Sequence, residues 1–331
     1  MQYSLSYRLG ANSGIGEKFD PDHFVVVVDT SLAAGATVRI PVNARTGVAD
    51  RTIDWGDGAV ETQNGANPEH TYAIDGEYTI KMYGATTTIL GNSLSANWQQ
   101  RVTRIVQWGK AIGWTNFTSG LQGCTQNVKV PKDIPRTEDG YAANVTNISN
   151  MFRSTNLFNQ DIGLWNTAAV LNMTNLFFGA SAFNQNIGSW NTAAVTNMAG
   201  IFLNASVFNQ NIGSWNTASV TNMSQAFQGA AAFNQNIGSW SLRTASVTLT
   251  NMLDNCGMST ENYSRTLIGW ANSVDANGDL PSGSTLGATG RTYNNTAYVS
   301  GQTYNDAVSA KAYLTGAAPD PAWTISDAGQ V

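Results

Sequence analysis

The sequence is poor in charged side chains. Asp, Glu, Lys and Arg make up 12% of its 331 residues, and the formal net charge is −5. An average soluble protein is about 25% charged. Residues 145–240 contain only two formally charged side chains, Arg153 and Asp161. Proteins that bind nucleic acid neutralise phosphates with clustered Lys and Arg. Since the sequence has no such cluster, we expect no nucleic-acid partner.

Cysteines are scarce and long apolar runs are missing. Cys124 and Cys256 are too few for a disulfide framework, and we expect them to be buried thiols near the two ends of the repeat region. The longest apolar run, Phe24–Val28, is too short to cross a bilayer, which argues against membrane insertion. The N-terminal segment 'MQYSLSYRLG' lacks the apolar core of a signal peptide, so we expect no export signal.

The residue sets that catalysis needs are also missing. His23 and His70 are the only histidines, and we expect a structural role for His70. A glycosidase needs two carboxylates, whereas the repeat region offers Asp161 alone. No His/Cys cluster has zinc spacing. We therefore predict that the protein is not an enzyme and needs no cofactor, with a carbohydrate-active enzyme as a distant alternative.

One loop resembles a calcium site in part. Asp275, Asn277 and Asp279 occupy the first three ligand positions of a calcium-binding loop. The sixth position is Leu280 instead of Gly, and the twelfth is Leu286 instead of Glu. We therefore favour a polar loop over a metal site.

The most informative feature is a repeat with a period of 25 residues. It is marked by three sets of residues: Val145, Val170, Val195 and Val220; Phe158, Phe183, Phe208 and Phe233; and Trp165, Trp190, Trp215 and Trp240. A fixed period of this length indicates a solenoid in which each repeat adds one layer. Within each repeat we expect a short strand at 'AVTNM'. One or two helical turns should follow, as around Met223 and Phe227, ended by Gly229.

The repeated amides and tryptophans allow a structural and a ligand-binding interpretation. Copies in successive layers would lie about 4.8 Å apart, where repeated charges repel and neutral amides form ladders. We therefore favour a structural role for Asn184 and Asn209. The tryptophans Trp165, Trp190, Trp215 and Trp240 are by the same reasoning core residues. The alternative is a ligand site in which exposed indoles, above all those of Trp190 and Trp215, stack on a sugar beside the amides.

The segment before the repeats has the pattern of strands and turns. In 'RTIDWGDGAVET', the residues Trp55, Gly56, Asp57 and Gly58 lie between two extended pieces, and we expect Asp57 to accept hydrogen bonds from backbone N–H groups of a tight turn. In 'GEYTIKMYG', apolar and polar residues alternate as in an antiparallel strand with one buried face. With 'HTY' before it, this segment resembles the PKD-like family. The resemblance implies an immunoglobulin-like β-sandwich used as a spacer.

The repeat phrases 'FNQNIGSWNT' and 'VTNM' resemble the BspA-like surface-protein repeats of bacteria, a divergent branch of the leucine-rich-repeat class. The resemblance extends over residues 45–329 and implies a solenoid with cell-surface and adhesive roles. We therefore predict a mixed α and β multidomain fold. It has an N-terminal arm (1–20), a PKD-like β-sandwich (21–90), an N-terminal cap (91–144), the repeat solenoid (145–257) and a C-terminal cap (258–331). Helices are expected at 259–274 and at 303–315, the second starting with a capping box of Thr303 and Asp306 and ending at Gly316.

A rigid neutral rod of this kind is suited to binding partners rather than transforming them. Without an export signal, a protein that acts outside a cell can be released by lysis. We therefore expect a phage virion surface component, such as a decoration, fibre or host-recognition protein, with other virion proteins or a host-surface glycan or protein as partners. The alternative is a bacterial cell-surface or extracellular adhesin that binds a glycan or a protein. The sequence leaves a homo-oligomer open in either case.

Overall fold

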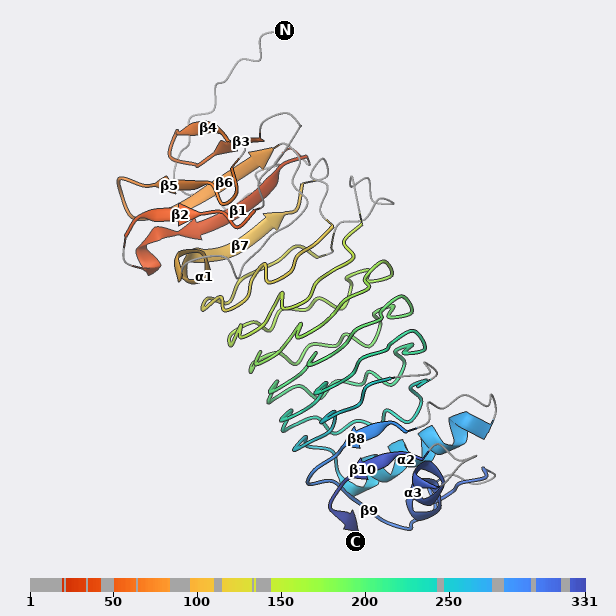
Figure 1. The fold of residues 1–331 in the computed structure, drawn as a ribbon. Coiled ribbons are helices and arrows are strands. Elements are labelled where there is room, and N and C mark those ends of the chain that lie inside the picture. The colour runs from red at the N-terminus through yellow and green to blue at the C-terminus, as the bar shows by residue number, and fades with distance from the viewer. Residues whose placement is uncertain are drawn as a thin grey trace.

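The protein is elongated, with a sheet at its N-terminal end, a stack of coils in the middle and two helices at its C-terminal end (Figure 1). The computed structural model describes residues 20, 22–33, 35–42, 51–63, 65–83, 96–109, 115–132, 134, 144–242, 247–275, 283–298, 302–316 and 322–331. One cluster of buried apolar side chains runs from Phe24 to Trp323. The core therefore passes through all three parts.

The N-terminal part is built on one antiparallel sheet in the order β4-β3-β6-β1-β7. Its strands are β1 (Phe24–Asp29), β3 (Arg51–Asp54), β4 (Val60–Gln63), β6 (Glu77–Tyr83) and β7 (Val102–Gln107). A separate ribbon pairs β2 (Thr37–Arg39) with β5 (Glu69–Thr71). The 3-10 turn η1 (Thr30–Leu32) follows β1, and helix α1 (Ala96–Arg101) precedes β7. Valines make up most of β1 and are fully buried, which suits a strand covered on both faces.

The predicted immunoglobulin/PKD-like β-sandwich is wrong. A sandwich needs two sheets packed face to face. The described strands of this part form one five-stranded sheet and a two-stranded ribbon instead. The alternating pattern around Ile80 and Met82 does mark an antiparallel strand, which is β6. Alternation shows that one face is buried, but it does not show what buries that face.

Strand β7 joins the sheet to the repeats. On one side Arg104 of β7 pairs with Val27 of β1, and on the other side it forms a parallel bridge with Lys129. The N–H of Ile105 donates to the carbonyl of Lys129 at 2.7 Å. Residues 102–107, which we expected inside a solenoid cap, therefore form the edge strand from which the repeat stack continues.

Backbone hydrogen bonds tie each repeat to the next at every second residue. In one repeat the N–H groups of Met173, Asn175, Phe177 and Gly179 donate to carbonyls of the following repeat at 2.8–2.9 Å. Of the N–H groups between them, those of Leu176 and Phe178 donate within the repeat to the carbonyls three residues back, and that of Thr174 donates to the Oδ1 of Asn172. This alternation requires a left-handed backbone twice per repeat, with φ 53° at Asn175 and 65° at Gly179. Asn and Gly tolerate that conformation better than other residues do.

The predicted leucine-rich-repeat-like solenoid is wrong as well. Among the described residues of 144–242 there is no helix, and successive repeats pair only through single bridges such as Asn172–Asn197. The helical turns expected around Met223 and Phe227 do not form, because Gln225 between them is left-handed with φ 58°. The repeats make a regular stack of turns rather than a closed solenoid. Over the residues that the structure describes, the chain is thus mostly strand and turn with few helices, and the expectation of a mixed α and β fold is wrong.

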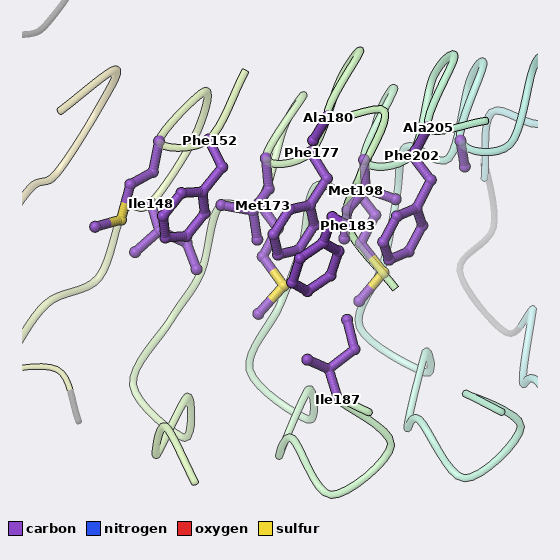
Figure 2. Packing of buried hydrophobic residues seen from close by; sticks show 14 of the residues in the cluster. Ile148, Phe152, Met173, Phe177, Ala180, Phe183, Ile187, Met198, Phe202 and Ala205 are labelled. Atoms are coloured by element: carbon purple, nitrogen blue, oxygen red, sulfur yellow. The ribbon is translucent and has the colours of Figure 1, made fainter. Parts of the chain in front are cut away.

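Aromatic rings fill the interior of this repeat stack. Three rows run along it: Phe152, Phe177, Phe202 and Phe227, with ring centroids 5.5–5.6 Å apart; Phe158, Phe183, Phe208 and Phe233, 5.9–6.3 Å apart; and Trp165, Trp190, Trp215 and Trp240, 6.2–6.4 Å apart. Figure 2 shows Phe152, Phe177 and Phe202 at equivalent places on consecutive coils, with Met173 and Met198 beside them. Within each repeat the two phenylalanine rings also stack on each other, with centroids 3.8–4.1 Å apart, so each ring is buried against its copies and against the neighbouring row.

The C-terminal part combines helices α2 (Thr260–Asp275) and α3 (Ala307–Thr315) with two parallel ribbons. The ribbons pair β8 (Thr285–Gly287) with β10 (Thr324–Ser326), and β9 (Thr292–Tyr293) with β11 (Gly329–Gln330). The helix predicted over 259–274 is confirmed by α2. The helix predicted over 303–315 starts later, because Asp306 itself caps α3 by accepting the N–H of Ser309. Its predicted end at Gly316 is confirmed.

Candidate binding surface

The tryptophans of the repeats form a buried, hydrogen-bonded row. Trp165, Trp190, Trp215 and Trp240 are at most 3% exposed. The Nε1–H of Trp190 donates to the carbonyl of Ile162 in the preceding repeat at 3.0 Å. The indoles of Trp215 and Trp240 donate one repeat back in the same way, and that of Trp165 donates to the carbonyl of Pro131, in the segment before the repeats. A sugar that stacks on aromatic rings needs exposed ring faces, and these four indoles offer none.

The tryptophan row continues beyond the last repeat. Trp270 lies in α2, yet its Nε1–H donates to the carbonyl of Ile237 at 3.2 Å, as an indole of a further repeat would do. Helix α2 therefore takes the place of the next layer and covers the end of the core. The sequence predicted this helix but gave no sign that its tryptophan belongs to the row.

The repeated Asn and Gln side chains form a ladder between repeats. The Oδ1 of Asn184 accepts the backbone N–H of Asn209 at 2.9 Å and the Nε2–H of Gln210 at 3.0 Å. The Oδ1 of Asn209 accepts the corresponding groups of Asn234 and Gln235, both at 2.8 Å. The side-chain oxygens of Asn184 and Asn209 thus hold adjacent repeats together.

A second set of polar residues faces solvent at the turn before each tryptophan. Asn186, Asn211 and Asn236 form one exposed row, and Ser189, Ser214 and Ser239 form another. Each asparagine Oδ1 accepts the N–H of the glycine two residues on, at 2.9–3.0 Å. Each serine Oγ–H donates to a glycine carbonyl of the preceding repeat, at 2.6–2.8 Å. We call these two rows the polar track.

The polar track ends in a cleft of about 330 Å³ between the last repeat and α2. The repeat contributes Asn236 and Ser239, and α2 contributes Arg265, Asn272 and Ser273. The floor is backbone, because Gly238 and Gly269 meet so closely that a Cβ on Gly269 would lie 2.5 Å from the carbonyl oxygen of Gly238. The cleft was not predicted from the sequence. Its only signal was a glycine inside a helix, in 'LIGWA', which favours a close backbone approach.

A separate polar cluster lies on the N-terminal sheet. Gly56, Asp57 and Gly58 form the turn from β3 to β4, where the Asp57 Oδ1 accepts the N–H of Ala59 at 3.0 Å. His70 stacks on Trp55, with ring centroids 5.1 Å apart, and its Nε2 lies 2.8 Å from the Asp57 Oδ2. Burial alone would raise the pKa of Asp57, but the hydrogen bonds from His70 and the Ala59 N–H outweigh it and lower that pKa. This cluster fixes the turn.

The candidate metal loop lies mostly outside the described residues. Asn277 and Asp279 fall in the undescribed stretch, and of Asp275 only the backbone, at the end of α2, is placed. Within the part of the chain that the structure describes, no three His, Cys, Asp or Glu side chains are grouped so as to hold a metal ion. Cys124 and Cys256 are free and buried, and burial raises the pKa of both thiols.

A family model described as "Mycoplasma protein of unknown function, DUF285" matches residues 132–266. The matched stretch holds the aromatic stack and the first turns of α2, and it fits the expected BspA-like repeat resemblance in its broad outline. It does not reach the N-terminal sheet, where the PKD-like resemblance is without support. No curated protein matches the chain, and no solved structure matches it.

Proposed function

We propose that this protein is a non-enzymatic structural and binding protein that carries a neutral surface on a rigid repeat stack. One observation carries the proposal: the indole and amide side chains that recur in every layer form hydrogen bonds within the stack. The indoles and the Asn184-type amides bond to adjacent repeats, while the polar track remains on the outside without formal charge. Such a surface recognises partners by hydrogen bonds and shape.

The stack resists deformation because its contacts recur without interruption from one layer to the next. Every layer adds the same backbone bonds, the same indole bond and the same amide bonds. Among the described residues no helix is both long and apolar enough to span a bilayer. These features suit a protein that works as a spacer between an attachment point and a partner.

For its location we propose the virion surface, where it would act as a decoration, fibre or host-recognition protein. Peptide mass spectrometry and antibody labelling of purified phage particles and of host envelopes test this. We expect a fixed number of copies per particle. Absence from particles, together with recovery from envelopes, would refute the virion assignment.

A bacterial cell-surface adhesin is the second candidate. The observation that favours it is the match of residues 132–266 to a family model whose description names Mycoplasma, a bacterium. The same labelling experiment decides between the two candidates, because an adhesin would be found on intact cells and would be removed from them by external protease.

A further inference from the structure

We propose that the cleft at α2 is a binding site for a neutral sugar, and that the polar track guides a longer glycan chain into it. This inference deepens the proposed binding function and rests on it. The cleft brings together side chains of the last repeat and of α2 that lie far apart in sequence, Asn236 and Ser239 with Arg265, Asn272 and Ser273. Its volume of about 330 Å³ is at the lower end of small-molecule sites, which suits one sugar ring.

The hydrogen bonds within the protein determine which polar groups remain for a ligand. The Oδ1 of Asn236 is held by the N–H of Gly238 at 2.9 Å, so its Nδ2 group points the other way. That group has no hydrogen-bond partner among the described residues. Ser239 donates its only proton to the carbonyl of Gly213 at 2.6 Å, which leaves its oxygen lone pairs to accept. Ser273 likewise donates to the carbonyl of Trp270 and remains an acceptor.

Donors and acceptors therefore stand side by side, which is the pattern that vicinal hydroxyls of a sugar satisfy. A hydroxyl both donates and accepts, so one hydroxyl can accept from the Asn236 amide while its neighbour donates to the Ser239 oxygen. Gln302, also at the cleft, adds an amide that can do both.

The charge of the cleft favours a neutral ligand. Arg265 is its one charged lining residue, and its guanidinium is already paired with Glu261, at 2.9–3.0 Å. The same guanidinium lies over the ring of Tyr298, 4.6 Å from the centroid, which fixes its plane. An anionic sugar would have to compete with Glu261 for this cation, whereas a neutral sugar does not.

The polar track indicates that the ligand is longer than one ring. Asn186 and Asn211 repeat the outward amide of Asn236, and Ser189 and Ser214 repeat the outward lone pairs of Ser239. Successive copies lie about one strand spacing apart, roughly 4.8 Å, which is close to the length of a sugar unit. The first repeat breaks the pattern, since Asp161 and the 77% exposed Leu164 stand at the same places. The track therefore covers three repeats and ends in the cleft.

The first repeat also supplies matched substitutions for the test. Asp161 accepts the N–H of Gly163 at 2.9 Å, so an aspartate at this position keeps the turn bond and lacks only the amide donor. The double variant Asn236→Asp/Ser239→Leu thus rebuilds the cleft edge in the form of the first repeat. The control, Asn186→Asp/Ser189→Leu, makes the same change at the far end of the track. Equal unfolding midpoints for both variants and the native chain establish that the fold is kept.

The experiment is isothermal titration calorimetry of the full chain with maltohexaose, cellohexaose and the fully N-acetylated hexamer of chitin, each followed by its monosaccharide. We expect one of these neutral hexasaccharides to bind, with an affinity that changes little with salt. The cleft variant should lose about tenfold or more, the worth of roughly one hydrogen bond to a polar group. The control variant should bind the monosaccharide unchanged and the hexasaccharide a few-fold more weakly.

Two results would overturn the inference. One is that none of the three hexasaccharides binds the native chain. The other is that the cleft variant binds them as well as the native chain does. A sulfated or sialylated glycan that alone binds would also count against the neutral site. Retained attachment of the native chain to particles or cells, in the absence of sugar binding, would remove this inference while leaving the proposed surface function intact.

Discussion

Replacing Trp215 with alanine tests whether the indole row holds the repeat stack together. The side chain is 2% exposed, and its ring lies 6.3 Å from Trp190 and 6.2 Å from Trp240. Large-to-small changes of a buried Trp cost about 3–5 kcal/mol. The lost Nε1–H bond adds about 1 kcal/mol and no more, because its acceptor, the carbonyl of Ile187, keeps the N–H of Trp190 at 3.1 Å. We therefore expect Trp215→Ala to lower the free energy of unfolding by about 4–6 kcal/mol.

Urea unfolding followed by far-ultraviolet circular dichroism measures this change. Trp215→Phe should cost about 1–2 kcal/mol, because the phenyl ring keeps the stacking but loses the indole N–H and part of the volume. Leu164→Ser is the control: Leu164 is 77% exposed and occupies the place of Ser189, so its replacement should stay within about 0.5 kcal/mol. A loss below about 1 kcal/mol for Trp215→Ala would refute the packed row, because a buried, stacked indole cannot be removed at so small a cost.

Four further changes probe other contacts. Asn209→Ala should lower the free energy of unfolding by about 1–2 kcal/mol, since the N–H of Asn234 loses its acceptor, while the Nε2–H of Gln235 keeps the backbone carbonyl of residue 209. Gly269→Ala should cost about 1–3 kcal/mol, because the added methyl would collide with backbone of the last repeat. Lys311→Met should cost about 3 kcal/mol, since the Asp327 carboxylate, 3% exposed, would lose its ammonium partner at 2.7 Å. In Asp57→Asn, thermal stability should depend less on pH below about pH 5. The pKa of Asp57 is lowered in the folded protein, so its contribution is present above the unfolded value near 4 and is lost as the pH falls through the folded value.

Each of these changes has a control. Asn209→Asp keeps the acceptor oxygen and should cost less than half as much as alanine. Gly65→Ala should be neutral or slightly stabilising, because nothing lies within 4 Å of the added Cβ. For the ion pair, Asp327→Asn in the Lys311→Met background should recover part of the lost stability, because it removes the unpaired carboxylate. For Asp57, the native chain itself must lose stability between about pH 5 and pH 3. Unfolding curves and melting temperatures report all four, and an alanine at Gly269 that stabilises the protein would contradict the close contact described for α2.

Much of the repeat stack was predictable, because its signal is repeated. The period of 25 placed Trp190 and Trp215 at equivalent positions, and the absence of repeated charge predicted neutral ladders such as the one through Asn184. The local path of the chain was not predictable in the same way. Met223 and Phe227 have helical spacing, but the backbone between them turns left-handed at Gln225 to send its N–H to the next repeat. Spacing alone cannot reveal that long-range bond.

The fold of the N-terminal part and the presence of the cleft could not be predicted from the sequence, for a related reason. Alternation in β6 predicts one strand and its buried face, whereas the number of sheets depends on which distant segments pair, as β7 does with β1. The cleft depends on a contact between Gly238 and Gly269, residues with no shared pattern. Sequence periodicity predicts the contacts between layers that repeat, but it does not predict the contacts at the end of the stack, where the repeats stop.

The contacts of each layer reach only to the layers before and after it, as the chain of bridges from Asn147 through Asn172 and Asn197 to Asn222 shows. If one whole 25-residue unit were removed or duplicated, the two ends of the protein would meet the same kind of neighbour as before. Each event would change the reach of the rod by about 4.8 Å. The length of the stack can therefore change by whole units without altering the N-terminal sheet or the α2 cleft.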